Sequence, residues 1–308
     1  MAKRDFLSVL DLSRDELMDV LDLAARLKKE HHAGTLKPML ANKVLALIFH
    51  KPSLRTRVSF ESGMARLGGR SIYISNQEIG MGTREAVSDI AEVLSRYVDA
   101  IMIRTFAHSW AEDLARHASV PVINGLTDSS HPCQILADLQ TVRESFPDLT
   151  GRRIVFIGDG NNVCRSWMNA ARRLPIEVTL ACPEGYELDA SFLAAAKKDA
   201  GNRIRVEHDP KVAATGADVL YTDVWASMGQ EGEAEARKTV FRPFQINKAL
   251  LDLAKPEAIV LHCLPAHRDE EITDEIMRHP RARIFDEAEN RMHAQNALLV
   301  RLLAEPWR

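Results

Sequence analysis

The sequence predicts an α/β protein with two domains, each a mostly parallel β-sheet flanked by helices. Strand-length and helix-length patterns alternate along the chain, which is typical of parallel sheets covered by helices on both faces. The apolar run at 44–49 indicates a strand buried on both faces. The chain has 308 residues, and a single hydrophobic core rarely organises that many.

The first half is expected to contain four strands with helices between them. Ser13 and Glu16 form a capping-box pattern that predicts a helix to about Glu30. Pro132 suits the first position of a later helix, where proline loses no helical hydrogen bond. The other expected elements are strands at 44–49, 71–74, 100–103 and 120–123, and helices at 55–67, at 87–96 and ending at 114.

The second half begins after a turn at 149–151, and the domain boundary is placed near 146–148. The predicted domains are therefore 1–146 and 147–308. The last helix, about 287–303, is expected to pack back on the first domain. Strands are expected at 153–157, 177–181, 203–206, 218–221 and 258–261.

A polar, charged stretch at 225–239 interrupts this pattern. It is longer than the usual connection in an α/β unit, and long loops in compact domains are often functional lids. We therefore expect a mobile loop there.

Composition excludes several classes of protein. Lys+Arg is 40 against 43 Asp+Glu, so there is no basic excess to bind a nucleic-acid backbone. No signal peptide is recognised at the N-terminus, and the longest apolar run, 44–49, is too short to span a membrane. The four cysteines are scattered without a CxxC pair, which favours a reducing, cytoplasmic compartment. They are Cys133, Cys164, Cys182 and Cys263.

The segment 53–57, Ser-Leu-Arg-Thr-Arg, follows the predicted buried strand and begins a helix. A helix N-terminus offers unpaired N–H groups and a partial positive charge, and an arginine adds a fork that matches phosphate. Residues two apart on a helix point to different sides. We therefore assign Arg55 to a phosphate ligand and Arg57 to a structural ion pair. The alternative is an ordinary capped helix with two surface arginines.

Further polar side chains follow other predicted strands of the first half. Arg104 ends one strand, and His131 and Gln134 lie at the start of the helix opened by Pro132. An imidazole can polarise a carbonyl, and a Gln amide can bind an NH₂ group. Taken alone, simple capping explains His131 equally well.

The segment 262–265, His-Cys-Leu-Pro, follows a strand of the second half. Pro265 raises the chance of a cis peptide bond, and Cys263 could be a nucleophile, a metal ligand or a soft contact. A zinc site built from His131, Cys133, His262 and Cys263 is disfavoured, because the spacing matches no zinc motif.

Three residues of the second half suit an amino-acid ligand. Asn161 and Asn162 present amides at a helix start, which fits a carboxylate, and Asp223 follows a strand, which fits an ammonium group. The stretch 158–163 is similar to a dinucleotide fingerprint but ends in valine and lacks the downstream acid. Phosphate-type groups in one half and amino-acid-type groups in the other predict a two-substrate enzyme with a cleft between domains.

Four ordered motifs carry a family resemblance. They are Ser53-Leu54-Arg55-Thr56-Arg57, His131-Pro132-Cys133-Gln134, Asp223-Val224-Trp225-Ala226-Ser227-Met228-Gly229 and His262-Cys263-Leu264-Pro265. At these motifs the chain resembles the aspartate/ornithine carbamoyltransferase family over essentially its whole length. The last two motifs favour the ornithine branch.

Two positions depart from the family pattern. Leu54 stands where a second threonine is usual, and its backbone N–H is expected to serve the phosphate. Gly80 stands where many members have a glutamine that contacts the carbamoyl group, and Gln77 is the candidate substitute.

The resemblance implies transfer of a carbamoyl group from carbamoyl phosphate to the δ-amine of L-ornithine, giving L-citrulline and phosphate, in arginine metabolism. It implies direct attack with no metal, cofactor or covalent intermediate. The implied carbamoyl phosphate ligands are Ser53, Leu54, Arg55, Thr56, Arg104, His131, Gln134, Cys263, Leu264 and Arg291. The implied ornithine ligands are Asn162, Asp223, Ser227, Met228 and Cys263, and the implied catalytic residues are Arg55, Arg104, His131 and Cys263.

The resemblance also implies a homo-oligomer, a trimer, with the segment 77–85 near the neighbouring subunit. Three alternatives stay open. One is a carbamoyltransferase for another amine such as putrescine, the second is a nicotinamide-dependent oxidoreductase, and the third is a noncatalytic amino-acid-binding protein.

Overall fold

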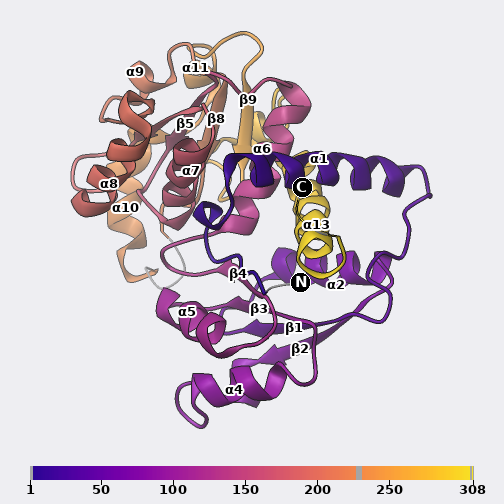
Figure 1. Cartoon of the computed structure of the whole chain (residues 1–308). Helices are drawn as coiled ribbons and strands as arrows, with labels where there is room; N and C mark the ends of the chain where they lie inside the picture. The colour runs from indigo at the N-terminus through magenta and orange to yellow at the C-terminus, as the bar shows by residue number, and fades with distance from the viewer. Residues whose placement is uncertain (1–2, 227–230, 306, 308) are drawn as a thin grey trace. The chain divides into compact units, whose positions relative to one another are not determined.

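The computed structural model describes residues 3–226, 231–305 and 307, and the chain forms two compact units (Figure 1). Unit 1 consists of Met1–Gln140 with Glu289–Arg308, and unit 2 consists of Thr141–Ala288. The α/β class predicted from the sequence is confirmed, because both units contain a parallel sheet with helices around it. The functional domains 1–146 and 147–308 stay a prediction.

Unit 1 contains a four-stranded parallel sheet in the order β2-β1-β3-β4. Its strands are β1 (Val44–Phe49), β2 (Arg70–Ser75), β3 (Ala100–Arg104) and β4 (Val122–Leu126). Its helices are η1 (Val9–Asp11), α1 (Arg14–His32), α2 (Leu54–Arg66), α3 (Asn76–Ile79), α4 (Val87–Leu94) and α5 (His108–His117). The unit boundaries fall within α6 (Pro132–Ser145) and α13 (Ile284–Leu303).

Unit 2 contains a five-stranded parallel sheet in the order β7-β6-β5-β8-β9. Its strands are β5 (Arg153–Ile157), β6 (Glu177–Ala181), β7 (Ile204–Glu207), β8 (Val219–Thr222) and β9 (Ile259–His262). Its helices are α7 (Asn162–Arg173), α8 (Ala190–Ala200), η2 (Gly201–Arg203), α9 (Pro210–Ala214), η3 (Glu231–Glu233), α10 (Ala234–Phe241), η4 (Arg242–Phe244), α11 (Lys248–Leu251) and α12 (Asp274–Met277).

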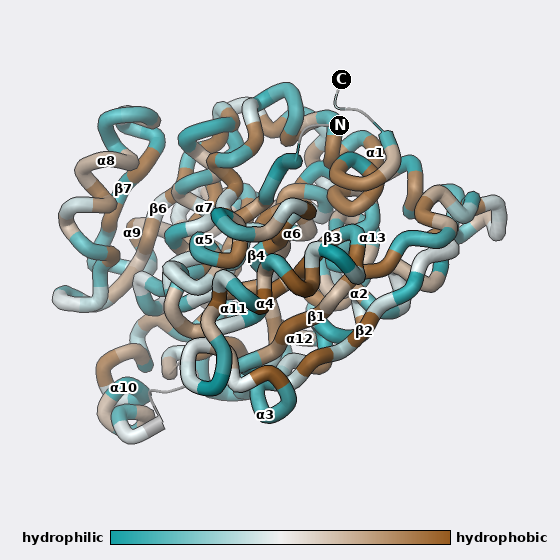
Figure 2. The backbone as a smooth tube through the Cα atoms, turned by 60° about the horizontal axis from the view of Figure 1, so that its bottom comes forward, coloured by the Kyte–Doolittle hydropathy of each residue, from teal (hydrophilic) through white to brown (hydrophobic). Residues whose placement is uncertain are grey.

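The sheets form the centres of the cores. Every residue of β3 and β8 is buried, as expected for parallel strands covered on both faces. The tube of α8 carries both hydrophilic and hydrophobic stretches (Figure 2), and its buried residues, Ala196 and Ala200, lie four positions apart on one face. Within the described residues, no helix combines the length and the apolar character that crossing a bilayer requires.

The predicted return of the last helix to the first part of the chain is confirmed. In unit 1, Nη2 of Arg301 on α13 donates to Oδ1 of Asp19 on α1 at 2.8 Å, and Nζ of Lys28 donates to Oδ1 of Asn290 at 2.9 Å. Figure 1 shows α13 beside α1 and α2. The last helix therefore completes unit 1, although Arg301 and Asp19 lie 282 positions apart in the sequence.

Two sequence predictions need correction. The strand expected at 120–123 is β4, which begins at Val122, because Pro121 has no N–H to donate to a ladder. Residues 234–239, expected within a loop, lie in α10, whose Ala, Glu, Arg and Lys residues favour helix. Residues 227–230 of the same expected loop lie outside the described residues.

Each sheet has one point where the direction of strand order reverses. In unit 1 this point lies between β1 and β3, and in unit 2 between β5 and β8. The connections leaving the carboxyl ends of two such strands diverge to opposite sides, which leaves a crevice where ligands bind in α/β folds. A ligand site is therefore expected in the segments that follow these four strands.

Candidate active site

The first segment, after β1, begins α2 with a side-chain cap. Ser53 is the N-cap residue, and its Oγ accepts the backbone N–H of Thr56 at 3.3 Å and donates to Oγ1 of Thr56 at 3.1 Å. The side chain of Leu54 is 73% exposed, so only its backbone N–H is suited to a ligand at the helix start. The local geometry is that of an anion-binding helix N-terminus.

The hydroxyl of Thr56 is a meeting point for side chains from three elements. Nη1 of Arg104, at the end of β3, lies 3.5 Å from Oγ1 of Thr56, and Nη2 of Arg291, on α13, lies 3.3 Å from it. All three residues are buried. A neutral hydroxyl thus lies between two guanidinium groups, which leaves an excess of positive charge at this point.

Arg291 also holds Gln134 in one orientation. Nη1 of Arg291 donates to Oε1 of Gln134 at 2.6 Å, and Nε2 of Gln134 donates to Oδ1 of Asp138 at 2.7 Å. An amide oxygen has two lone pairs, so Oε1 of Gln134 can accept from a ligand as well as from Arg291. Asp138 lies one helical turn after Gln134, so an i, i+4 pairing in the sequence was the signal for its role.

His131 lies in a field of positive charge. Burial lowers the pKa of His131 well below its ordinary value. Nearby guanidinium charges lower it further, those of Arg291, Arg104 and Arg55. The imidazole is therefore neutral near pH 7, and its single N–H can donate a hydrogen bond to a ligand oxygen.

The two arginines of the Ser53 segment have different surroundings. Nε of Arg57 pairs with Oε1 of Glu61 at 3.0 Å, and its guanidinium lies 3.9 Å from the centre of the Tyr73 ring. The predicted structural ion pair of Arg57 is confirmed. The guanidinium group of Arg55 acts electrostatically on His131, as those of Arg104 and Arg291 do.

In unit 2, Asp223 follows β8 and is surrounded by neutral donors. Oδ2 accepts from Nδ2 of Asn161 at 2.8 Å, and Oδ1 accepts from Sγ of Cys263 at 3.1 Å and from the backbone N–H of Val224 at 2.8 Å. Asn161 is also the N-cap of α7 and follows β5. Residues after β5, β8 and β9 thus meet around one carboxylate.

The sequence suggested Asn161 and Asn162 equally as carboxylate ligands. The structure separates them, because Asn161 is occupied with Asp223 and with two N–H groups of α7. Asn162, the first residue of α7, is half-buried. Ser227 and Met228, also proposed for the amino acid, lie outside the described residues.

The histidine of the segment after β9 is structural. Nδ1 of His262 accepts the N–H of Leu264 at 2.9 Å, so its Nε2 carries the proton and donates to Oε1 of Glu271 at 2.9 Å. The Leu264–Pro265 bond is cis, as the sequence suggested. His262 thereby positions the backbone beside Cys263, although the sequence offered it only as a possible zinc ligand.

Cys133, the other cysteine of the disfavoured zinc set, is unsuited to metal binding. Its Sγ donates to the backbone oxygen of Asn124 at 3.4 Å, and burial raises the pKa of its thiol to about 12. A thiol held protonated is a poor ligand, because metals bind the thiolate.

Arg237 was missed by sequence reasoning. Its side chain is buried, and Nη1 donates to Oδ2 of Asp159 and to the backbone oxygen of Trp225, both at 3.0 Å. It therefore fixes the chain on both sides of residues 227–230. An arginine within a stretch that reads as solvent-exposed gives no local signal of burial.

Close packing explains Gly160, which follows β5. A Cβ at Gly160 would lie 2.6 Å from the backbone nitrogen of Leu188, and the N–H of Gly160 donates to the oxygen of Tyr186 at 2.9 Å. Gly160 therefore permits close approach of two backbones, and a dinucleotide is not needed to account for it.

The chain matches both parts of one family. Residues 4–144 match the carbamoyl-P binding domain of aspartate/ornithine carbamoyltransferases, and residues 150–302 match the Asp/Orn binding domain. The chain belongs to the aspartate/ornithine carbamoyltransferase family. The resemblance drawn from the four motifs is confirmed.

Individual members of the family are similar over nearly the whole chain. Ornithine carbamoyltransferase from Syntrophus aciditrophicus is 51% identical over 297 residues, covering 96% of this chain and 98% of its own length. Anabolic ornithine carbamoyltransferase from Pseudomonas aeruginosa is 48% identical over 303 residues, 98% of each chain. The structure of ornithine carbamoyltransferase from Pyrococcus furiosus superimposes with a TM-score of 0.94 at 48% identity, covering 98% of this chain and 97% of that one.

Proposed function

We propose that the protein is an ornithine carbamoyltransferase, which transfers the carbamoyl group of carbamoyl phosphate to the δ-amine of L-ornithine and releases L-citrulline and phosphate. The observation that carries the proposal is the convergence of Arg55, Arg104 and Arg291 around Thr56 and His131. Family members of about 50% identity bear this name, which supports ornithine as the acceptor.

The phosphate would bind at the start of α2. Ser53 and Thr56 offer hydroxyl groups, Leu54 offers its N–H, and Arg55 and Arg104 offer charge-assisted hydrogen bonds. Guanidinium groups also stabilise the negative charge that accumulates on the leaving phosphate. Phosphate departure is therefore assisted by fixed positive charges of unit 1.

The carbamoyl carbonyl would point to Thr56, Arg104 and His131. The carbonyl oxygen becomes negative when the amine attacks, and preorganised donors stabilise that charge. Neutral His131 would supply one such donor. Oε1 of Gln134, fixed by Arg291 and Asp138, would accept a hydrogen bond from the carbamoyl NH₂. The contacts proposed for Cys263 and Leu264 with the carbamoyl group stay predictions.

Ornithine would be held through its amino-acid end in unit 2. Asp223 is the group proposed to take the α-ammonium, because its known partners are neutral and leave its negative charge available. Asn162, Ser227 and Met228 are proposed to complete this contact. The δ-amine attacks the carbonyl carbon, the carbon–oxygen bond to phosphate breaks, and the proton lost by the nitrogen balances the charge of the departing phosphate, which leaves as hydrogen phosphate.

An acceptor panel tests this proposal. The protein is incubated with carbamoyl phosphate and, separately, with ornithine, putrescine or aspartate, and the ureido product is measured. Product with ornithine, at a rate at least about 100-fold above putrescine, is expected because putrescine lacks the α-carboxylate of ornithine. Absence of product with all three amines would disprove the transferase assignment.

We also propose a homotrimer in the cytoplasm, with the segment 77–85 near the neighbouring subunit. The support is the family resemblance together with four free cysteines, as expected for a reducing compartment. The first part of that segment lies in α3, and Gly80 ends the helix with a φ of 56°. Light scattering should give three times the 34.5 kDa chain mass, and a monomer would contradict the trimer.

A further inference from the structure

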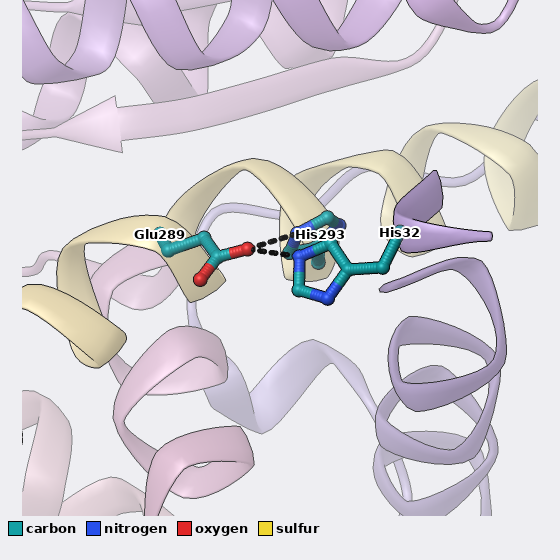
Figure 3. A group of neighbouring side chains, drawn as sticks. All are labelled: His32, Glu289 and His293. Atoms are coloured by element: carbon teal, nitrogen blue, oxygen red, sulfur yellow. Dashed lines mark hydrogen bonds and ion pairs between the residues drawn. The ribbon is translucent and has the colours of Figure 1, made fainter. Parts of the chain in front are cut away.

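Three metal-ligating side chains meet on α1 and α13 of unit 1. Nε2 of His32 lies 2.6 Å from Oε1 of Glu289, and Nε2 of His293 lies 3.2 Å from the same oxygen (Figure 3). The three ligand atoms all lie within 4.8 Å of one another. Glu289 and His293 are each two positions from Arg291, so they lie on a different side of α13 from the candidate active site.

The chemistry of the group matches a zinc site. Two imidazoles and one carboxylate form a known three-ligand set for Zn²⁺, with a water in the fourth position. Glu289 and His293 are four residues apart on one helix, so they share a face without any change of backbone. Tetrahedral bonds of about 2.0–2.1 Å separate ligand atoms by about 3.3–3.4 Å. His32 would have to retreat by less than about 1 Å to accommodate the ion.

The two histidines differ in a way that suits such a site. The side chain of His293 is 1% exposed, and its Nδ1 has no hydrogen-bond partner among the described residues. The polar contact of His293 is therefore made by its Nε2, and that atom faces Glu289. The side chain of His32 is 55% exposed, at the last residue of α1. One ligand is fixed by packing, and the other can adjust and admits solvent.

The ammonium group of Lys28 opposes the binding of a cation. Lys28 lies close enough to act electrostatically on His293, and its Nζ donates to Oδ1 of Asn290 at 2.9 Å. Repulsion from this ammonium group weakens a site for a divalent cation. Removal of Lys28 should therefore strengthen metal binding, whereas removal of a ligand should weaken it.

We propose that unit 1 binds a divalent transition cation, Zn²⁺ in particular, through His32, Glu289 and His293. The ion would link the carboxyl end of α1 to α13. Because the three ligands come together only in the folded chain, binding stabilises the folded state.

Cobalt(II), whose visible absorption reports a low-coordinate site, is the probe for the first experiment. The full-length protein is titrated with Co²⁺, and the absorption is compared in wild type, His32→Ala and Glu289→Gln. We expect each substitution to weaken this absorption-detected binding by about 10-fold or more, because even residues that only orient ligands change affinity by that much. Equal Co²⁺ binding in wild type and both variants would overturn the proposal.

Two other groups of possible ligands contain a cysteine, and they are Asp223 with His262 and Cys263, and Cys182 with Glu187 and His208. A thiolate bound to Co²⁺ adds an intense near-ultraviolet charge-transfer band. The proposed site contains no sulfur, so the absorption that depends on His32 must lack this band. A His32-dependent signal accompanied by the band would contradict the ligand set.

Matched variants sharpen the test. His117→Ala removes an exposed histidine elsewhere in unit 1 and should leave Co²⁺ affinity within about twofold of wild type, since surface changes far from a site rarely matter. Lys28→Ala should raise the affinity several-fold, and unchanged or weaker binding would contradict the proposal. Saturating Zn²⁺ should raise the Tm of wild type by about 2–4 °C, and an equal rise in His32→Ala would overturn the link between α1 and α13.

Discussion

Unit 1 and unit 2 both gather polar side chains where the strand order of a parallel sheet reverses, yet the gathered charges are opposite. Unit 1 brings guanidinium groups around Thr56 and His131. Unit 2 brings Asn161 and Cys263 around the carboxylate of Asp223. The fold therefore determines where a ligand can bind, whereas the charge of a few side chains after the strands determines which ligand binds there.

The largest expected effect tests the positive cluster of unit 1. Arg55→Ala should nearly abolish turnover, lowering kcat/KM by about 10³-fold or more, because a preorganised charge near the leaving phosphate is lost. Arg57→Ala is the matched control and should remain within about threefold of wild type, since an exposed ion pair contributes little. Steady-state kinetics checks both. The division of roles fails if Arg57→Ala is as inactive as Arg55→Ala while its thermal unfolding is unchanged.

The next effect tests the carboxylate of unit 2. Asp223→Asn should lower kcat/KM for ornithine by about 10²-fold, because a charge-assisted hydrogen bond to the α-ammonium is lost. The KM for carbamoyl phosphate should change by less than about threefold. Glu235→Gln, which alters a carboxylate that is 88% exposed, is the control. Equal changes in the KM of both substrates would show that the two units do not divide the substrates.

The dependence of activity on pH separates His131 from the attacking amine. Below the pKa of the δ-amine of ornithine, kcat/KM for ornithine should rise about tenfold per pH unit between about pH 6 and pH 9, because only the free amine attacks. His131 is already neutral over this range, since burial and three guanidinium groups depress its pKa. His131→Asn should lower the whole profile without flattening it. A flat wild-type profile would exclude rate-determining attack by the free amine.

The smallest effect concerns stability in acid. The unfolded chain binds a proton at His131 below about pH 6.5, whereas the folded chain does not, because its pKa is depressed. The free energy of unfolding is therefore highest above that pH and falls with decreasing pH, by at most about 1.4 kcal/mol per pH unit. Urea unfolding of wild type and His131→Asn at pH 7 and pH 5 should show a smaller loss in the variant. An equal loss in both would assign the acid sensitivity to other groups.

Much of the fold could be predicted because its signals are local. β5 and β6 have the bounds expected from the sequence, 153–157 and 177–181, and Ser13 caps α1 as its capping box indicates. The expected start of β4 is two residues too early, because the expected strand 120–123 includes Pro121, which has no N–H to donate to a ladder. The helix α10 was not predicted because the whole stretch 225–239 is polar.

The candidate site also contains features that the sequence could indicate and features that it could not. The helix start at Ser53 is a local feature, so the sequence indicated an anion site there. The contact of Arg291 with Thr56 joins residues 235 positions apart, and only the family resemblance suggested it. The choice between Asn161 and Asn162 depends on the direction of α7 relative to Asp223, which no sequence pattern specifies.

One competition experiment tests the central claim most directly. The protein receives ¹³C-labelled carbamoyl phosphate with equal concentrations of ornithine, putrescine and aspartate, and NMR identifies the labelled products. If unit 1 presents the carbamoyl group and Asp223 holds the α-ammonium of ornithine so that the δ-amine attacks, nearly all transferred label appears in citrulline. Label in carbamoyl aspartate or carbamoyl putrescine at comparable levels, or no transferred label at all, would contradict the account.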